Sequence, residues 1–291
     1  MAFPKNGVVT APKIMPSAFG LLAVAKPENS ADEDMWIRGF AQEWETTVNY
    51  LTNWDDTDTT SDVLVNNATV NYSDYIKPFF IEVEENISTL GFNGLDRIAR
   101  ISRQIEGMSQ HALESELWDG VIRKGESHDN LALSAAGATV LNSGTALSAR
   151  RALALLEFEI GQASHAGEQG VIHMTRDVFA LISANGQAFY HEEGKDHLQT
   201  LAGTPVIVGS GYSGTGPDGN ANAAASITNK WMYATGMVKT YLGNVDVVNE
   251  NLAQAYDVSG NQNDMKLKAI RPAAVYFDPS IHLAVRVDLS V

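Results

Sequence analysis

A glycine-rich turn, Gly209–Gly214, is the segment whose spacing most suggests chemistry. Its pattern, G-x-G-x-x-G after the predicted strand Pro205–Val208, is typical of loops that bind a dinucleotide pyrophosphate. Such a loop must open into a helix, because the first amides of that helix bind the phosphates. Here residues 215–222 break helices, and Asp218 follows too closely to reach a ribose. We therefore expect an exposed loop, with a nucleotide-dependent enzyme using Gly209–Gly214 as an alternative.

The histidines and aspartates have the wrong spacing for metal sites. His191 and His197 are six positions apart, whereas a zinc protease helix needs two histidines four apart so that both face the metal. A site that also used His173 is unsupported by any motif. Asp56, Asp58 and Asp62 lack the central glycine and final glutamate of a calcium loop, so a solvated loop tip is expected. No serine stands in a G-x-S-x-G turn, so we predict no catalytic residue, no cofactor and no metal site, and we do not expect an enzyme.

Composition excludes several classes of protein. The chain has 291 residues, 44% of them hydrophobic, which is enough for one large domain or two modest ones. The formal net charge of −15 disfavours a nucleic-acid-binding protein, because phosphate binding needs Lys and Arg. The absence of cysteine excludes disulfides and thiolate zinc sites. No apolar run is long enough for a bilayer, and the N-terminus lacks a secretory signal, so we expect synthesis and use in a cytoplasm.

The first thirty residues indicate an extended arm. Four of the nine prolines fall here, and proline removes an amide donor and favours extended backbone. The arm also carries an apolar patch that comprises Ile14, Met15, Phe19, Leu21, Leu22 and Val24. Because a solvated tail has no use for such a patch, we expect a neighbouring copy of the chain to cover it.

The next sixty residues predict a helix and a long hairpin. Apolar residues between positions 32 and 51 recur every three or four residues, which indicates an amphipathic helix. A polar stretch, residues 53–62, follows it. Residues 63–72 and the run Ile76–Val83 are typical of strands, and Pro78 places one of them at a sheet edge.

The clearest single element is a helix over Leu95–Trp118, which Gly120 would end. Its predicted apolar stripe comprises Leu95, Ile98, Ile101, Ile105, Met108, Ala112 and Leu117. Its predicted polar face comprises Arg97, Arg100, Arg103, Glu106, Glu114 and Glu116. At 1.5 Å per residue the helix would be roughly 36 Å long.

The remainder mixes helices and strands, which predicts an α+β fold. Helices are expected over Leu147–Gln162 and directly after Thr175, and a long loop over Gly209–Asn229. Strands are expected at Val171–Met174, Phe189, Leu198, Pro205–Val208, Trp231–Thr235, Met237–Leu242, Met265–Phe277 and His282–Leu289.

Several segments taken together are distinctive in their order and spacing. They are Ile81–Gly91, Ala112–Gly120, Val171–Thr175, Gly203–Tyr212, Trp231–Gly236 and His282–Leu289. In this order they resemble the major capsid proteins of tailed bacteriophages with the Hong Kong 97-type fold, especially those of phages that infect actinobacteria. The resemblance extends over roughly two thirds of the chain.

The resemblance implies a division of the chain into five parts. These are an N-terminal arm (1–35), an extended β-hairpin loop (36–90), a peripheral domain with a long spine helix (91–129), an axial domain (130–262) and return strands of the peripheral domain (263–291). The axial domain of such proteins lies near the symmetry axes, so the resemblance implies that the Gly209–Asn229 loop approaches neighbouring copies there.

The resemblance also implies a structural function. The chain would self-assemble into hexamers and pentamers of an icosahedral shell that encloses double-stranded DNA, assembled in the host cytoplasm and present in the virion. Its partners would be itself, a portal, decoration proteins and a separate scaffold protein, since no charged-helix scaffolding domain precedes the fold. Packaged DNA would lie nearby without sequence-specific binding, and no membrane partner is expected.

Eleven residues are candidates for contacts between copies: Phe19, Leu22, Trp54, Tyr72, Tyr75, Lys77, Arg97, Arg100, Arg103, Tyr212 and Pro217. Some relatives join their subunits by a lysine–asparagine isopeptide bond on the extended loop. The only lysine between residues 36 and 90 is Lys77, which adjoins Pro78 instead of the polar tip, so we expect no such crosslink.

Two further alternatives remain open. An encapsulin-like nanocompartment would use the same fold for a shell loaded with an enzyme, and the long N-terminal arm disfavours it. A soluble monomeric binding module would need no partner copy.

Overall fold

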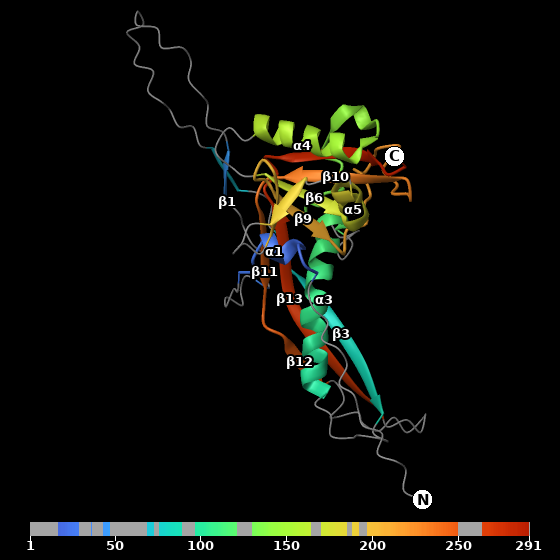
Figure 1. The fold of residues 1–291 in the computed structure, drawn as a ribbon. Helices are drawn as coiled ribbons and strands as arrows, with labels where there is room; N and C mark the ends of the chain where they lie inside the picture. Colours follow the sequence, from blue (N-terminus) through green and yellow to red (C-terminus); the bar gives the residue numbers. More distant parts are fainter. Residues whose placement is uncertain are drawn as a thin grey trace, which may run out of the picture.

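The computed structural model shows two main sheets, a separate two-stranded sheet and a long helix that packs against both main sheets (Figure 1). The described residues are 17–28, 36, 43–46, 69–72, 76–88, 97–120, 130–163, 170–184, 188–191, 197–249 and 264–290. Their mixture of helices and strands confirms the expected α+β class. None of the helices among them is long and apolar enough to cross a membrane.

The smaller sheet is built around one long strand, β13 (Asp264–Phe277). Strand β3 (Phe79–Ser88) pairs antiparallel with one side of it. Strands β11 (Val238–Leu242) and β12 (Asp246–Asn249) pair with successive parts of the other side. Within the described part of the chain β3 is therefore an edge strand, as the position of Pro78 predicted.

Helix α3 (Arg97–Asp119) packs along this sheet and confirms the predicted long helix. Its 23 residues span about 35 Å at 1.5 Å per residue. It ends at Gly120, whose φ of 61° is a conformation that glycine adopts without strain.

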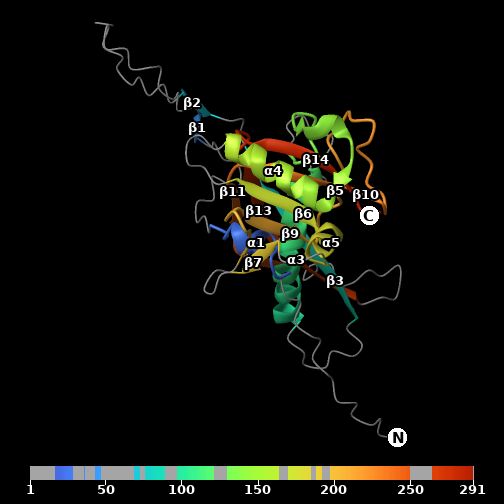
Figure 2. The ribbon, with the colours of Figure 1, turned by 45° about the horizontal axis from the view of Figure 1, so that its top comes forward.

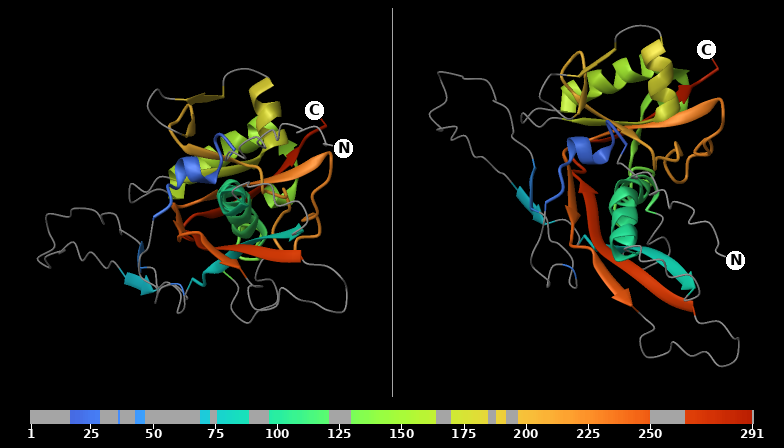
Figure 3. Two further views of the ribbon diagram at one scale, coloured as in Figure 1. Left: turned by 90° about the horizontal axis from the view of Figure 1, so that it is seen from below. Right: turned by 60° about the horizontal axis from the view of Figure 1, so that its bottom comes forward.

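The predicted apolar stripe of α3 is only partly correct. Ile101 is fully buried, but Ile98 and Met108 are 57% and 48% exposed. Glu114 and Glu116, which were expected on the solvent face, are buried. The reason is that the C-terminal half of α3 lies between the two sheets, so more of its circumference is covered there (Figure 3).

The larger sheet has eight strands, in the order β4-β14-β10-β6-β9-β8-β7 with β5 also paired to β14. Their bounds are β4 (Thr139–Val140), β5 (Leu147–Ser148), β6 (Val171–Thr175), β7 (Phe189–His191), β8 (Leu198–Thr200), β9 (Pro205–Gly209), β10 (Asn229–Thr235) and β14 (His282–Asp288). A short 3-10 turn, η2 (Leu141–Gly144), follows β4. The expected strands of this region are thereby confirmed.

Both faces of the larger sheet are covered. Helices α4 (Ala149–Ala163) and α5 (Arg176–Ala184) lie on one face, and the end of α3 lies on the other (Figure 2). Successive residues of β6 therefore serve two cores: Ile172 packs beneath the helices, whereas Val171 belongs to the core shared with α3.

The predicted helix over residues 32–51 is wrong at residues 43–46. These residues form strand β1 (Glu43–Thr46), which pairs antiparallel with β2 (Thr69–Tyr72). The hydrogen bonds between the two strands satisfy the backbone donors and acceptors that hydrogen bonds within a helix would otherwise satisfy. The antiparallel pair is consistent with the predicted hairpin, whose polar stretch, residues 53–62, lies outside the described residues.

The two sheets do not follow the predicted division of the chain. Strand β14, expected with the peripheral domain, pairs with β10 in the larger sheet. Strands β11 and β12, expected in the axial domain, pair with β13 in the smaller sheet. The boundaries at residues 130 and 263 therefore do not separate the two sheets. Each sheet combines strands from distant segments of the chain.

Candidate functional site

A buried carboxylate, Glu114 of α3, joins three separate parts of the chain. Its Oε1 accepts hydrogen bonds from the amide of Leu21 (3.0 Å) and from Nε2 of Gln110 (2.8 Å). Its Oε2 accepts hydrogen bonds from the amides of Ser210 (2.7 Å) and Gly211 (2.8 Å). The Ser210 hydroxyl donates a further bond to Oε2 (2.9 Å). Both oxygens are thus satisfied, which offsets the cost of burying a charge.

The Gly209–Gly214 turn packs onto α3, so the expectation of an exposed loop is wrong. A Cβ on Gly211 would lie 2.5 Å from the backbone oxygen of His111. Amides of the turn already bind the Glu114 carboxylate, which occupies the place that such a turn offers to a phosphate. No helix opens after the turn, since the next element is β10. This geometry disfavours the nucleotide-dependent enzyme.

The residues after the turn are fixed to the end of α3 as well. Oδ1 of Asp119 accepts hydrogen bonds from the hydroxyls of Ser213 (3.1 Å) and Thr215 (2.6 Å). Nε1 of Trp118 donates to the carbonyl of Thr215 (3.2 Å). The start of the predicted Gly209–Asn229 loop is therefore part of the folded core.

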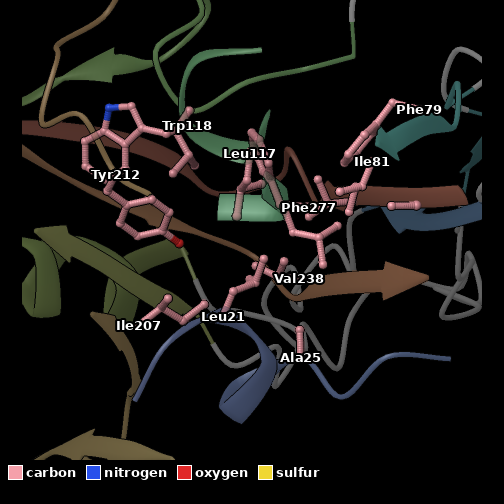
Figure 4. Packing of buried hydrophobic residues seen from close by; sticks show 14 of the residues in the cluster. Leu21, Ala25, Phe79, Ile81, Leu117, Trp118, Ile207, Tyr212, Val238 and Phe277 are labelled. Atoms are coloured by element: carbon pink, nitrogen blue, oxygen red, sulfur yellow. The ribbon is translucent and has the colours of Figure 1, made fainter. Parts of the chain in front are cut away.

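Residues 17–28 fold back onto their own subunit through helix α1 (Leu21–Val24). Leu21 and Ala25 are buried in the core between α3 and the two sheets (Figure 4). The carbonyl of Phe19 accepts a hydrogen bond from an amide of β9 (2.8 Å), and Glu28 forms a bridge to β11. The expectation that a neighbouring copy covers the apolar patch is wrong for these residues, because the subunit itself buries them.

A second buried polar network surrounds His173 of β6. The hydroxyl of Thr235 donates to the carbonyl of Gly236 (2.9 Å), so it can only accept from Nε2 of His173, 2.9 Å away. Nδ1 then accepts from the hydroxyl of Tyr212 (2.9 Å). Burial, with a smaller contribution from nearby His282, lowers the pKa of His173 to about 3. The imidazole is thereby held neutral in a single tautomer.

The structure does not gather the candidate metal ligands. His173 uses both ring nitrogens inside the core. His191 is exposed, and His197 lies 2.9 Å from the side-chain amide of Gln199. No group of three His, Asp or Glu side chains close enough to hold a metal occurs among the described residues.

Four predicted contact residues lie largely within the subunit. Tyr212 is 7% exposed, and its ring centroid is 4.5 Å from that of Trp118. Pro217 is buried, whereas Leu22 and Phe19 are partly buried against the core. These side chains leave little surface for a neighbouring copy.

The charged candidates lie on α3. Arg97 is the first residue of this helix, and Arg103 is exposed on it. Arg100 forms an ion pair with Glu85 of β3 (3.5 Å). The pair links the helix to the edge strand, and the 44% exposure of the Arg100 side chain limits its contribution to stability.

Two of the four remaining candidates, Lys77 and Tyr72, lie among the described residues. The amide of Lys77 donates to Oδ1 of Asn130 (2.9 Å), and its carbonyl accepts from Nδ2 of the same side chain (2.8 Å). Tyr72 is the last residue of β2. Trp54 and Tyr75 lie outside the described residues.

The sequence reasoning missed Glu114 and Gln110. Glu114 was assigned to the polar face of the helix, because periodicity assigns charged residues to solvent, and Gln110 was assigned no role. One signal was present in the sequence: a glycine-rich turn with no helix after it still presents free amides that require an acceptor. Glu114, one helical turn before Trp118, was the available acceptor.

Comparisons with known proteins connect this architecture to one fold. A scan of protein-family models finds no match, and no curated protein is similar in sequence. The capsid of an empty GTA particle matches with a TM-score of 0.57 at 12% identity, over 97% of this chain and 100% of that chain. A chain of Gordonia phage Cozz matches with 0.54 at 12% identity, over 98% and 91%. The holo-SrpI encapsulin complex from Synechococcus elongatus matches with 0.52 at 12% identity, over 97% and 94%.

The fold is that of a phage capsid protein. More specifically, the chain has the Hong Kong 97-type capsid fold, as the order of its sequence segments predicted. The matched structures include assembled capsids. Because the sequence identity is only 12%, this structural likeness shows the fold alone.

Proposed function

We propose that the chain is the major capsid protein of a tailed-phage particle. In this role it assembles with copies of itself into the hexamers and pentamers of an icosahedral shell around double-stranded DNA. The observation that carries the proposal is the extent of the structural match, which includes 97% of this chain and 100% of the GTA capsid chain. The likeness thus extends to the whole architecture and is not limited to one motif.

The β1–β2 pair supports self-association. A two-stranded sheet is marginally stable by itself in water, and in the described part of the chain these strands pair only with each other. Figure 1 shows β1 standing apart from the two main sheets. Packing against a second copy would supply the surface that such a pair needs.

We propose no enzymatic role, because the buried polar groups around Glu114 form hydrogen bonds with one another. The proposal does include a separate scaffold protein, a portal and decoration proteins, with assembly in the host cytoplasm and a final place in the virion. It also includes weak contact with the packaged DNA, because a net charge of −15 opposes phosphate binding. Steeply salt-dependent binding of purified subunits to duplex DNA would contradict this last part.

Electron microscopy tests the function directly. The chain is produced alone and together with the scaffold protein from its own phage, then separated by gel filtration and imaged in negative stain. Closed shells or rings of five and six copies are expected. A species that remains monomeric in every condition, including with the scaffold, would refute the proposal and favour the binding module.

An encapsulin-like shell is the second candidate, because an encapsulin matches with a TM-score of 0.52. The contents of the particles separate the two functions. Nuclease-protected DNA in particles from infected cells supports the phage capsid, whereas particles that contain an enzyme and no DNA support the nanocompartment.

A further inference from the structure

A loop interrupts one edge of the larger sheet. Strands β4 and β5 both run parallel to β14. The pairing of β4 ends with Val140 opposite Ala284, and that of β5 begins with Leu147 opposite Val287. The six residues between them, 141–146, stand where two residues would continue the strand. We call these six residues the edge loop.

The two pieces that flank the edge loop form the border of the sheet. On its other side β14 pairs with β10 along all seven of its residues, so β4 and β5 must share the remaining side. The opposite border is strand β7, which has three residues. In the part of the chain that the structure describes, each border of the larger sheet therefore consists of very short strands, whereas the strands inside it are longer.

The edge loop contains a left-handed turn. Asn142 and Ser143 both have a φ of 50°, and Gly144 follows with a φ of 72°. Left-handed backbone is unfavourable for residues other than glycine, although Asn tolerates it better than most. Among the described residues only Phe19 also combines a side chain with a positive φ. Because a strand requires negative φ throughout, these residues cannot join β4 to β5 without reversing their backbone.

Hydrogen bonds inside the loop hold the turn in this shape. The amide of Thr145 donates to the carbonyl of Asn142 (3.0 Å), and Nδ2 of Asn142 donates to the carbonyl of Thr145 (3.0 Å). Gly144 is buried, and a Cβ on it would lie 3.4 Å from Nδ2 of Asn220. The side chains of Asn142, Ser143 and Thr145 are exposed. Core packing therefore does not explain the strained residues, and strain of this kind indicates a functional requirement.

We propose that the edge loop prevents a second copy of the chain from adding a strand to the larger sheet. An uninterrupted border strand would present a row of backbone donors and acceptors, which is a template for pairing with another chain. The left-handed turn divides that row into two short pieces and covers the gap with polar side chains. The inference rests on the proposed function, because a shell brings many copies together and must restrict them to the contacts that close it.

Deletion of residues 142–145 tests the edge loop, because Leu141 and Ala146 can then continue the strand opposite residues 285–286. The deletion variant should form irregular polymers at a concentration on the order of ten-fold lower than any association of the natural chain, since each added cross-strand pair strengthens the contact. Gel filtration, thioflavin T fluorescence and electron microscopy measure this change. Adding Ser148→Lys, a charge at an exposed position of the border, should reverse it.

A second pair of variants keeps the natural length of the chain. Asn142→Val/Ser143→Val disfavours the left-handed turn, because β-branched residues are poorly tolerated at positive φ, and it should also promote irregular polymers. Asn142→Gly/Ser143→Gly permits the turn and should associate like the natural chain.

The outcomes separate this role from the proposed function. A deletion variant that keeps the natural melting temperature and associates no more than the natural chain would overturn the inference. So would equal association of the valine and glycine pairs, which decides the matter if the deletion variant does not fold. Polymers that Ser148→Lys fails to reverse would also overturn it, since they would not form through the border strand. Each of these results leaves the capsid function standing, because that function is tested on the natural chain.

Discussion

Replacing Glu114 with glutamine removes one acceptor oxygen from the buried junction while keeping the shape of the side chain. The new amide group must face either the amide of Leu21 and the side chain of Gln110, or the amides of Ser210 and Gly211. The first orientation removes the acceptor of two donors, and the second removes the acceptor of two backbone amides and of the Ser210 hydroxyl, which can rotate to accept instead. A buried donor left unsatisfied costs about 1–3 kcal/mol, so we expect Glu114→Gln to destabilise the subunit by about 2–5 kcal/mol.

Urea unfolding of the unassembled subunit measures this loss, with the buried Trp118 and Trp231 as fluorescent reporters. Hydrogen exchange should also accelerate in residues 17–28, which the carboxylate holds to α3. Glu106→Gln is the matched control, because it makes the same charge change at an exposed position of the same helix, and it should shift stability by less than about 0.5 kcal/mol. If Glu114→Gln behaves like this control in both measurements, the assignment of Glu114 as the junction is wrong.

Three further substitutions test other parts of the core. His173 has a folded-state pKa of about 3 against an ordinary value of 6.5. Stability should therefore fall as the pH drops from 6.5 toward 3, by up to about 1.4 kcal/mol per unit, since only the unfolded chain takes up the proton. Urea midpoints at several pH values should show a flatter profile for His173→Asn. Gly211→Ala places a Cβ 2.5 Å from a backbone oxygen of α3 and should lower the melting temperature, whereas Gly137→Ala, with nothing within 4 Å, should not. Leu21→Ala should cost about 2–5 kcal/mol in urea unfolding, and equal effects from the partly exposed Leu22→Ala would contradict the docking of α1.

The sequence predicted those helices and strands whose residue patterns depend only on neighbouring positions in the chain. The long helix, its stop at Gly120 and the strands β6, β9, β10 and β13 follow from periodicity and turn residues alone. The capsid fold followed from a resemblance in the order of segments.

What the sequence could not predict depends on contacts between distant segments. Glu114 is buried because its five donors come from residues 21, 110, 210 and 211. Residues 43–46 have a helical spacing but form a strand, because β2 is present to pair with them. The patch around Leu21 was correctly read as needing cover, and the cover comes from the same subunit.

Helix α3 is covered on more sides at its C-terminal end, where Leu117 and Trp118 lie between the sheets, than in its N-terminal half, where Ile101 and Ile105 face the core and Ile98 is exposed. A rod of about 35 Å that turns about its C-terminal end, together with the sheet on which it packs, acts as a lever. A rotation of about 5° at the junction displaces its far end by about 3 Å for a helix of this length. In the proposed shell, such a small turn would let one subunit shape fit rings of five and of six copies, with the bending concentrated around a single buried carboxylate.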